Sequence, residues 1–439
     1  MHASERQLTH APYGHVLTNI NVWSPDSRFI VYDVRSVDSV FDGTRVEQVL
    51  VTEDDSKMHS VEELYTAKNG AACGVVTYHP REPKVIFIHG PENPTTEWSY
   101  GASRRRGVIL EVSGFFNEPR PLDAMTYAPP FRAGALRGGT HVHVFSPDGA
   151  WVSSTYEDEV LARLGAEGGH ERNQRNIAVA VPVRGGVKVG REHPRNHDGD
   201  YFSVVVTRTV NRPKPGSDEI SRAFEEGWVV DGPGRRSLAF LGNVTAPDGR
   251  EHAEVFLVDL PADLTNPGEA PLEGTATTRP APPRGVAQRR LTFTTGRKYP
   301  GVVTAPRHWV RSSPDGAQLA FLMKDDVGVV QLWAMPARGG EPRQVTRGAS
   351  GISSAFTWSP DGAQIAHTMD GSVCVTRVET GDTRRLTEAR SGTDAPEPLA
   401  CVFSPDGKQI AYTRRVAGKG GTFAQVFVVD AGTGSEARS

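Results

Sequence analysis

The chain alternates short apolar runs with turns that contain Gly, Pro, Ser and Asp. One such unit, an apolar run, a turn and a second apolar run, is repeated several times. In residues 356–367, FTWSPDGAQIAH, one apolar run enters Ser-Pro-Asp-Gly and a second leaves it. Proline fixes φ at the second turn position, Ser and Asp side chains bond the local backbone, and glycine takes a positive φ. The pattern predicts two antiparallel strands joined by a tight turn.

The same turn recurs along the chain at a nearly constant interval. Ser-Pro-Asp-Gly occurs again at 146–149, 313–316 and 404–407, and Ser-Pro-Asp-Ser at 24–27. The last three copies are spaced like the four-stranded blades of a propeller, about 40–45 residues each. A third apolar run and an Arg-Gln-Leu-Thr-like fourth run complete these units, as at 343–346 and 384–387.

The two ends of the chain complement each other. The last unit has only three strands, the third at 425–430, whereas residues 6–9, Arg-Gln-Leu-Thr, carry the fourth-strand signature ahead of the first unit. A strand from the N-terminus that completes the last blade would remove an open sheet edge. The sequence therefore predicts an all-β, closed seven-bladed β-propeller of four-stranded blades.

The chain, 1–439, is expected to form a single domain with the approximate blades 17–66, 73–124, 141–190, 201–292, 308–346, 354–387 and 399–430 plus 5–9. The fourth blade is the least regular. Its first strand is expected at 201–206, followed by an insertion at 207–235 in which 217–226 is predicted as a short helix capped by Ser217. Alternatively, 196–199 is a hairpin turn and 201–207 is the strand that leaves it.

Composition narrows the classes of partner. The net charge of -3 gives no global attraction to nucleic acid or to an anionic membrane. No apolar run approaches the ~18 residues of a transmembrane helix, and the N-terminus has no secretory pattern. The three cysteines, Cys73, Cys374 and Cys401, lie in apolar runs, which disfavours a disulfide framework. We expect a cytoplasmic protein without a nucleic-acid or membrane partner.

Candidate chemistry is concentrated at the start of the innermost strands, which line the central channel of a propeller. His141 and His143 are spaced i, i+2, which places both imidazoles on one side of a regular strand, as metal chelation requires. They could equally be two hydrogen-bonded channel histidines. His308 is a possible third ligand, or a polar channel residue.

Other candidates lie just outside these strands. His15, His197, Arg307 and Arg311 are placed to serve the channel as a base or as a carboxylate clamp. The run Arg104–Arg106 could grip a carboxylate or be solvated, and residues 156–159 and 170–176 could form a polar rim or solvated loops. No phosphate loop, Cys-x-x-Cys pair or Gly-x-Ser-x-Gly elbow is present, so no nucleotide cofactor is expected.

The Ser-Pro-Asp-Gly hairpins resemble the propeller repeats of TolB. The segments THVHVFSPDG at 140–149, RHW at 307–309 and PGSDEI at 215–220 resemble more narrowly the bacterial YidR-type propellers, which are related to oligogalacturonate lyase. Oligogalacturonate lyases are seven-bladed propellers that hold a divalent, Mn-type metal through histidines and a glutamine and cleave short uronides by β-elimination. The resemblance implies a divalent metal at the His-x-His pair, His141 and His143, with His308 as the possible third ligand from its position, and an acidic oligosaccharide as substrate.

Two functions therefore stand side by side. In the first, His15 or His197 is the base and Arg307 or Arg311 holds the carboxylate in a metal-assisted β-elimination. In the second, the protein is a non-catalytic, TolB-like propeller that presents its mouth to a protein or a small polar ligand. They differ in whether three or more of the histidines point at one centre.

Overall fold

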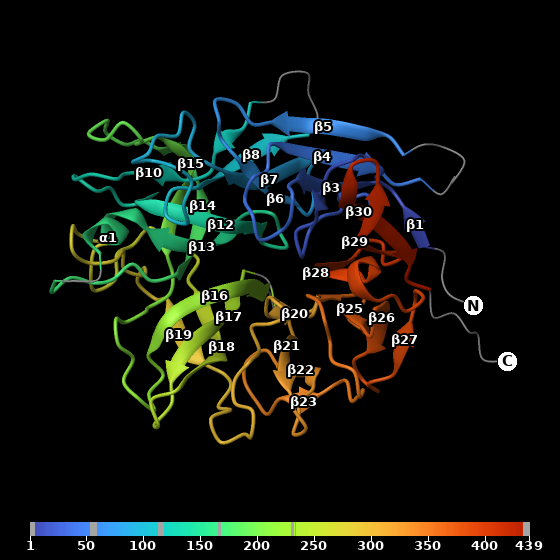
Figure 1. Ribbon diagram of the computed structural model, residues 1–439. Coiled ribbons are helices and arrows are strands. Elements are labelled where there is room, and N and C mark those ends of the chain that lie inside the picture. The colour runs from blue at the N-terminus through green and yellow to red at the C-terminus, as the bar shows by residue number, and fades with distance from the viewer. Residues whose placement is uncertain are drawn as a thin grey trace.

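The computed structural model describes residues 5–52, 59–112, 118–165, 168–229, 232 and 234–432. Seven four-stranded antiparallel sheets are arranged as blades around a central axis (Figure 1). The predicted all-β, seven-bladed propeller is confirmed. Residues 1–4 and 433–439 of the expected domain lie outside the described ranges.

Within blades one to six the chain runs from the innermost to the outermost strand. The strands of blades one to three are β2 (His15–Val16), β3 (Phe29–Val34), β4 (Arg45–Leu50), β5 (Val61–Thr66); β6 (Cys73–Tyr78), β7 (Lys84–His89), β8 (Arg106–Glu111), β9 (Arg120–Pro121); and β12 (Gly138–Phe145), β13 (Val152–Asp158), β14 (Asn176–Val187), β15 (Gly199–Val205). A short parallel pair, β10 (Ala124–Met125) and β11 (Ala135–Leu136), links blades two and three, and α1 (Glu159–Leu164) follows β13.

The remaining blades repeat this order. Their strands are β16 (Ile220–Val229), β17 (Arg236–Thr245), β18 (Glu251–Leu260), β19 (Ala287–Arg290); β20 (Arg311–Ser312), β21 (Gln318–Lys324), β22 (Val330–Pro336), β23 (Arg343–Gln344); β24 (Thr357–Trp358), β25 (Gln364–Met369), β26 (Ser372–Arg377), β27 (Thr383–Arg385); and β28 (Pro396–Phe403), β29 (Gln409–Gly418), β30 (Gly421–Asp430) with β1 (Glu5–Gln7). A 3₁₀ turn, η1 (Gly392–Asp394), precedes β28.

The N-terminal strand closes the ring as predicted. β1 pairs antiparallel with β30, with Glu5 opposite Val429. The Glu5 carboxylate also accepts hydrogen bonds from Arg414, at 2.9 Å, and Arg390, at 3.2 Å. The last blade thus gains its fourth strand from the other end of the chain (Figure 1).

The recurring Leu-Thr ending has a physical role. In blade six the Leu386 N–H donates to the Val373 carbonyl at 2.8 Å, and the Thr387 hydroxyl accepts from the Val373 N–H at 3.0 Å. Leu8 and Thr9 make the same two bonds to Val426, at 2.8 and 2.9 Å. The signature therefore docks each outer strand on its neighbour after the regular ladder ends.

This equivalence gives a test of ring closure. Leu8 and Leu386 are both buried, at 1 % and 0 % exposure. Because each fills the same position of its blade, Leu8→Ala and Leu386→Ala should each lower the free energy of unfolding by about 2–5 kcal/mol, measured by urea denaturation. A loss from Leu386→Ala alone would show that the N-terminal strand is undocked in solution.

The Ser-Pro-Asp-Gly turns are local scaffold. In the last copy the Ser404 hydroxyl donates to Asp406 at 2.6 Å and accepts from the Gln409 N–H at 3.0 Å. Gly407 takes φ +73°. In the Ser-Pro-Asp-Ser copy Ser27 adopts the same left-handed region, at φ +61°.

The boundary between blades three and four differs from the prediction. Residues 201–206 were expected to open blade four, but β15 is the outermost strand of blade three, paired with β14. The alternative also assigned this strand to blade four, as the one leaving a turn at 196–199, so neither prediction gave its place as the outermost strand of blade three. Blade three therefore spans 138–205, beyond the expected 141–190, and blade four begins at β16.

The predicted helix at 217–226 is wrong. Ser217 does form a local turn, with its hydroxyl donating to the Lys214 carbonyl at 2.7 Å, but Ile220–Val229 is the innermost strand β16. Glu225 and Glu226, which fall within the predicted helix, are 6 % and 2 % exposed. Their burial in the ring overrides the local helical pattern.

Trp side chains join neighbouring blades. The indole N–H groups of Trp23, Trp228 and Trp358 donate to the carbonyls of Val402, Val144 and Arg311, at 3.0, 2.9 and 3.1 Å.

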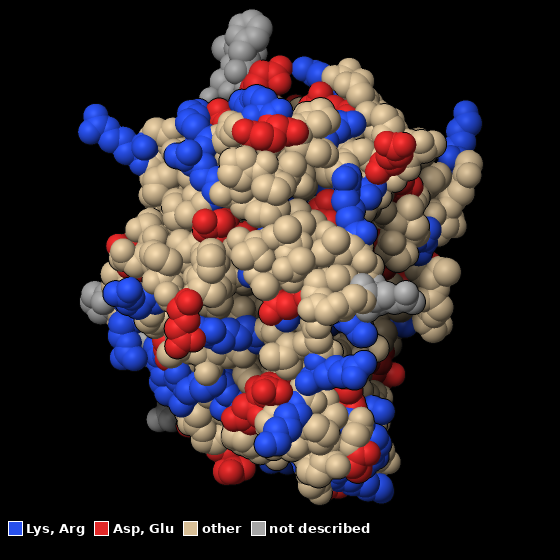
Figure 2. Space-filling model, turned by 90° about the vertical axis from the view of Figure 1, so that its left-hand side faces the viewer, with Lys and Arg blue, Asp and Glu red and all other residues tan. Residues whose placement is uncertain are grey.

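Figure 2 shows the side of the ring that carries α1, where Lys and Arg are interspersed with Asp and Glu. Within the described residues, no helix has the length and apolarity needed to cross a membrane.

Candidate functional site: an arginine-lined channel cavity

The innermost strands of blades two, three and four share a bulge. Val75, Val142 and Glu225 have φ of +58°, +53° and +55°, and the ladder to the next strand shifts at each of these points. A bulge inserts one residue and re-aims the side chains on either side of it. The regular alternation assumed for these strands is therefore broken where the candidate histidines lie.

His141 faces the channel. It borders a cavity of about 430 Å³ at the start of the innermost strands, together with Asn19, Arg105, Arg307 and Trp309. Its Nδ1 atom is buried and has no hydrogen-bond partner. Burial, and then the positive charges of Arg105 and Arg307, hold the pKa of His141 well below its usual value. The imidazole is therefore neutral at physiological pH and offers a free lone pair or N–H to a ligand.

His143 does not join His141. Its Nε2 atom donates to the Thr140 hydroxyl at 2.9 Å, and Thr140 in turn donates to Asp123 at 3.2 Å. The ring packs against Gly107 of blade two so closely that a Cβ there would lie 2.6 Å from Nε2. Burial lowers its pKa to about 3. The bulge at Val142 breaks the regular alternation on which the predicted i, i+2 ligand pair rests, so a metal held by His141 and His143 stays a prediction.

His308 is also committed to the fold. Its Nε2 accepts the Leu322 N–H at 3.1 Å, which leaves Nδ1 to donate to the Pro306 carbonyl at 3.1 Å. Both ring nitrogens are engaged by backbone, which disfavours the predicted role of His308 as a metal ligand.

The two candidate bases lie elsewhere. His15 is packed between Tyr13 and Tyr32 and bonds the Ala424 carbonyl through Nδ1 at 2.9 Å. His197 bridges Met125 on β10 and contacts the Asp198 carbonyl through Nδ1 at 3.1 Å. Neither borders the channel cavity. Their assignment as bases for a ligand bound there is not supported by their positions.

Arg307 belongs to the cavity as expected. Its Nε donates to Glu225 at 2.9 Å, and its guanidinium lies 4.5 Å from the Trp309 ring centroid. Arg311, its proposed companion, borders a different cavity on the side of the Ser-Pro turns. Only one of the two predicted clamps therefore serves this site.

Arg105 is a buried arginine at the same cavity whose guanidinium is only partly hydrogen-bonded. It is 8 % exposed, bonds the Tyr100 hydroxyl at 3.1 Å, and leaves its Nε atom without a partner. No carboxylate of the described residues lies within ion-pair distance of it. The neighbouring Arg104, by contrast, pairs with Glu159 at 2.9 Å. The run of three arginines was the sequence signal for this residue, but the run alone could not show which member turns inward.

The residues do not fit a metal held by three histidines. No group of three or more His, Cys, Asp or Glu in the described part of the chain is arranged to hold a metal ion. His141 is the only member of the predicted triad that borders this cavity among the described residues.

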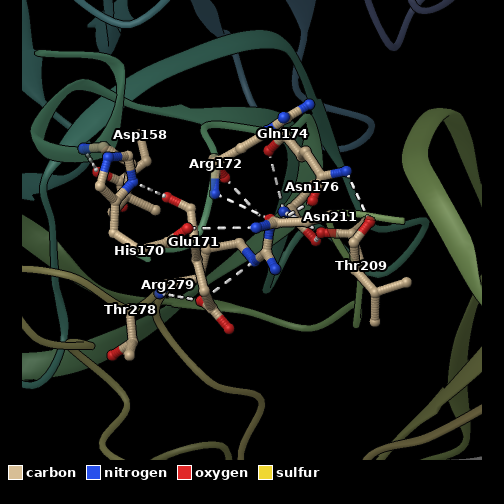
Figure 3. Close-up of polar contacts among 12 residues, drawn as sticks. Asp158, His170, Glu171, Arg172, Gln174, Asn176, Thr209, Asn211, Thr278 and Arg279 are labelled. Atoms are coloured by element: carbon tan, nitrogen blue, oxygen red, sulfur yellow. Dashed lines mark hydrogen bonds and ion pairs between the residues drawn. The ribbon is translucent and has the colours of Figure 1, made fainter. Parts of the chain in front are cut away.

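The polar rim predicted at 170–176 is engaged with the protein itself. Figure 3 shows Arg279, from the long loop after β18, among Glu171, Gln174 and Asn211. Its Nε lies 3.4 Å from Glu171, and its Nη1 donates to the Arg172 carbonyl at 3.1 Å. These groups fasten the loop to blade three.

Comparison with known proteins agrees with this architecture. The chain is 47 % identical over 410 residues to the uncharacterized protein YidR of Escherichia coli K12, covering 93 % of this chain and 94 % of that protein. The chain belongs to the YidR family. Residues 72–197 also match the family described as "Protein of unknown function (DUF3748)". In this YidR-family chain, that region contains both Arg105 and His141.

Two solved structures resemble this member of the YidR family in fold. Oligogalacturonate lyase in complex with manganese has a TM-score of 0.59 at 11 % identity, covering 98 % of this chain and 94 % of that one. Oligogalacturonate lyase from Vibrio parahaemolyticus has a TM-score of 0.55 at 9 % identity, with the same coverage. The resemblance predicted from sequence is confirmed for the family and for the fold.

Proposed function

We propose that the channel cavity binds a small acidic saccharide of the uronide class through its carboxylate. The observation that carries the proposal is the meeting of Arg105, Arg307 and the unpartnered His141 around one cavity of about 430 Å³. Arginine presents a planar fork of donors that matches a carboxylate. The shared fold with oligogalacturonate lyase supports a uronide as the ligand class.

Arg105 is the main clamp in this proposal. Arg307 is ion-paired with Glu225, and Arg35, which borders the same cavity, is ion-paired with Asp33. Within the described residues, the Arg105 side chain has only the Tyr100 hydroxyl as a hydrogen-bond partner. A buried cation without a counter-ion is costly, so a ligand carboxylate gains most by binding there.

His141 supplies the base for a β-elimination. The neutral imidazole takes the proton from the carbon next to the carboxylate, and the electrons of that bond form a carbon–carbon double bond. The bond to the leaving oxygen breaks, and this oxygen takes a proton from the imidazolium. Arg105 and Arg307 stabilise the charge that develops on the carboxylate. A bound anion also offsets the two positive charges that depress the pKa of His141.

A non-catalytic binding role is the second candidate. The observation that favours it is that His141, His143 and His308 do not converge. In that case the cavity retains the saccharide without cleaving it. Binding and turnover therefore have to be measured separately.

The test combines calorimetric titration with digalacturonate and an absorbance assay for the unsaturated uronide product. Arg105→Met should weaken binding at least about tenfold, which corresponds to about 1.4 kcal/mol. His141→Gln should leave the affinity within a few fold and lower turnover about 10²–10⁴-fold, as expected for loss of a general base.

Arg120→Met is the control, because Arg120 is exposed and lies on β9, the outermost strand of blade two. Unchanged affinity in Arg105→Met would contradict the binding site. If the wild-type protein binds digalacturonate but forms no unsaturated product, the catalytic proposal is contradicted and the non-catalytic binding role is supported.

A further inference from the structure

A second cavity lies on the opposite side of the channel, where the innermost strands reach the Ser-Pro turns. It has a volume of about 350 Å³ and is bordered by blades one, two, five, six and seven. Five turn prolines border it, namely Pro25, Pro80, Pro314, Pro360 and Pro405. The function proposed above makes no use of this cavity.

The wall of this second cavity is apolar because its aromatic residues direct their polar atoms into the protein. The indole N–H groups of Trp23 and Trp358 donate to backbone carbonyls of neighbouring blades. The Tyr78 hydroxyl donates to Gln48. Phe403 adds a ring with no polar atom. These side chains offer only their carbon faces to a ligand.

The smaller polar side chains of the wall are also satisfied. The Thr357 hydroxyl donates to the Cys401 carbonyl at 2.8 Å and accepts from the Phe403 N–H at 3.1 Å. His79 contacts the Gly149 carbonyl through Nε2 at 3.1 Å and accepts the Glu82 N–H through Nδ1 at 2.9 Å. Neither has a group left for a ligand.

Arg311 is different. Of the described residues that border this cavity, it alone carries a charged side chain, and it is 5 % exposed. Its guanidinium donates to the Asn19 side-chain oxygen, and no carboxylate of the described residues lies within ion-pair distance. Two acids, Glu225 and Glu226, lie close enough to act on the charge of Arg311. Glu225 is already paired with Arg307. The other, Glu226, has its pKa raised to about 8 by burial, so it is largely neutral at pH 7.

Asn21 supplies a second free polar group. Its side chain makes no hydrogen bond within the described structure, although its backbone carbonyl accepts the Tyr78 N–H at 2.6 Å. The amide therefore remains available at the same cavity.

From these contacts we infer that the Ser-Pro side of the channel is a second binding site, for a small molecule with a flat apolar body and one carboxylate. The carboxylate pairs with Arg311 and accepts from the Asn21 amide, and the body lies against the aromatic and proline wall. A buried guanidinium without a counter-ion gives this site its preference for an anion. The apolar wall gives it a preference for aromatic over fully polar anions.

Calorimetric titration of the full chain with three probes tests this site. The probes are 3-phenylpropionate, its neutral amide, and acetate. The acid should bind at least about tenfold more tightly than the amide, which lacks the charge, and than acetate, which lacks the body; each tenfold step is about 1.4 kcal/mol. This comparison uses only the wild-type protein, so it does not depend on any variant folding.

Substitutions then locate the site. Arg311→Met should reduce 3-phenylpropionate binding to the level of the amide, and Arg311→Lys should retain part of it, because lysine keeps the charge but loses the fork. Arg307→Met, in the other cavity, should leave this binding unchanged while it weakens digalacturonate binding. Equal affinities for acid and amide, no binding at millimolar probe, or full binding by Arg311→Met would each overturn the inference without bearing on the uronide site.

Discussion

Replacing Arg137 with methionine should lower the free energy of unfolding by about 3–5 kcal/mol, the range for breaking a buried ion pair. Arg137 is 0 % exposed. Its Nε donates to Asp158 at 2.8 Å, and its two terminal nitrogens donate to the carbonyls of Thr275 and Thr278, at 2.7 Å for Thr278. Methionine keeps much of the volume but leaves the buried Asp158 carboxylate without its counter-ion and removes one donor from each of the two carbonyls.

Urea denaturation of the Arg137→Met protein gives this number directly. The matched control is Arg120→Met, which breaks the exposed pair with Asp200 and should cost no more than about 1 kcal/mol. Equal small effects of the two substitutions would contradict the assigned role of Arg137. A further consequence is that the long loop after β18, which carries Thr275 and Thr278, should become more sensitive to protease in Arg137→Met.

Acidification should produce the other large effect, a steep loss of stability between about pH 6.5 and pH 4. Burial lowers the pKa of several histidines, among them His15, His197, His308 and His367, each to about 4, and His143, to about 3. In this interval the unfolded chain binds protons that the folded chain does not. Each such histidine therefore contributes about 1.4 kcal/mol per pH unit in favour of unfolding.

Two buried acids act in the opposite direction. Burial raises the pKa of Asp123 to about 6 and that of Glu226 to about 8. Their contributions to stability are present at low pH and are lost as pH rises through these values. Because histidines outnumber these acids, the net slope below pH 6.5 is positive, and stability should pass through a maximum near neutrality and decline toward pH 8.

Urea denaturation curves measured from pH 4 to pH 8 test both the loss of stability on acidification (the acid limb) and the decline above neutrality. Glu226→Gln should remove most of the decline above neutrality, since an amide does not titrate. His10→Gln, at an exposed residue, should leave the acid limb unchanged. A stability that is flat from pH 6.5 to 4 would show that the histidines titrate normally in the fold.

Most of the architecture could be predicted from sequence because it is built from repeats with local chemistry. The Ser-Pro-Asp-Gly turn and the Leu-Thr ending each make the same bonds in successive blades, as at Ser404 and Leu386. The error came in blade four, whose turn has a different sequence. Its innermost strand carries Glu225 and Glu226, which are both buried; Glu225 is paired there with Arg307 of blade five, a partner that is distant in the sequence.

The site was predicted less well, for a reason of backbone geometry. The i, i+2 rule requires a regular strand, whereas Val142 adopts a positive φ that is unusual for a β-branched residue. Nothing in the letters His-Val-His marks that bulge. Likewise, the run Arg104–Arg106 contains one member that borders the cavity and one that pairs with Glu159, and both lie in the loop before β8, where no strand periodicity applies.

The bond between Arg311 and Asn19 joins blade five to blade one, which are not neighbours in the ring, and so spans the channel. Arg311 borders one cavity and Asn19 the other. The bond therefore marks where the two cavities meet along the channel. A molecule that passed from one cavity to the other would have to move past these two side chains.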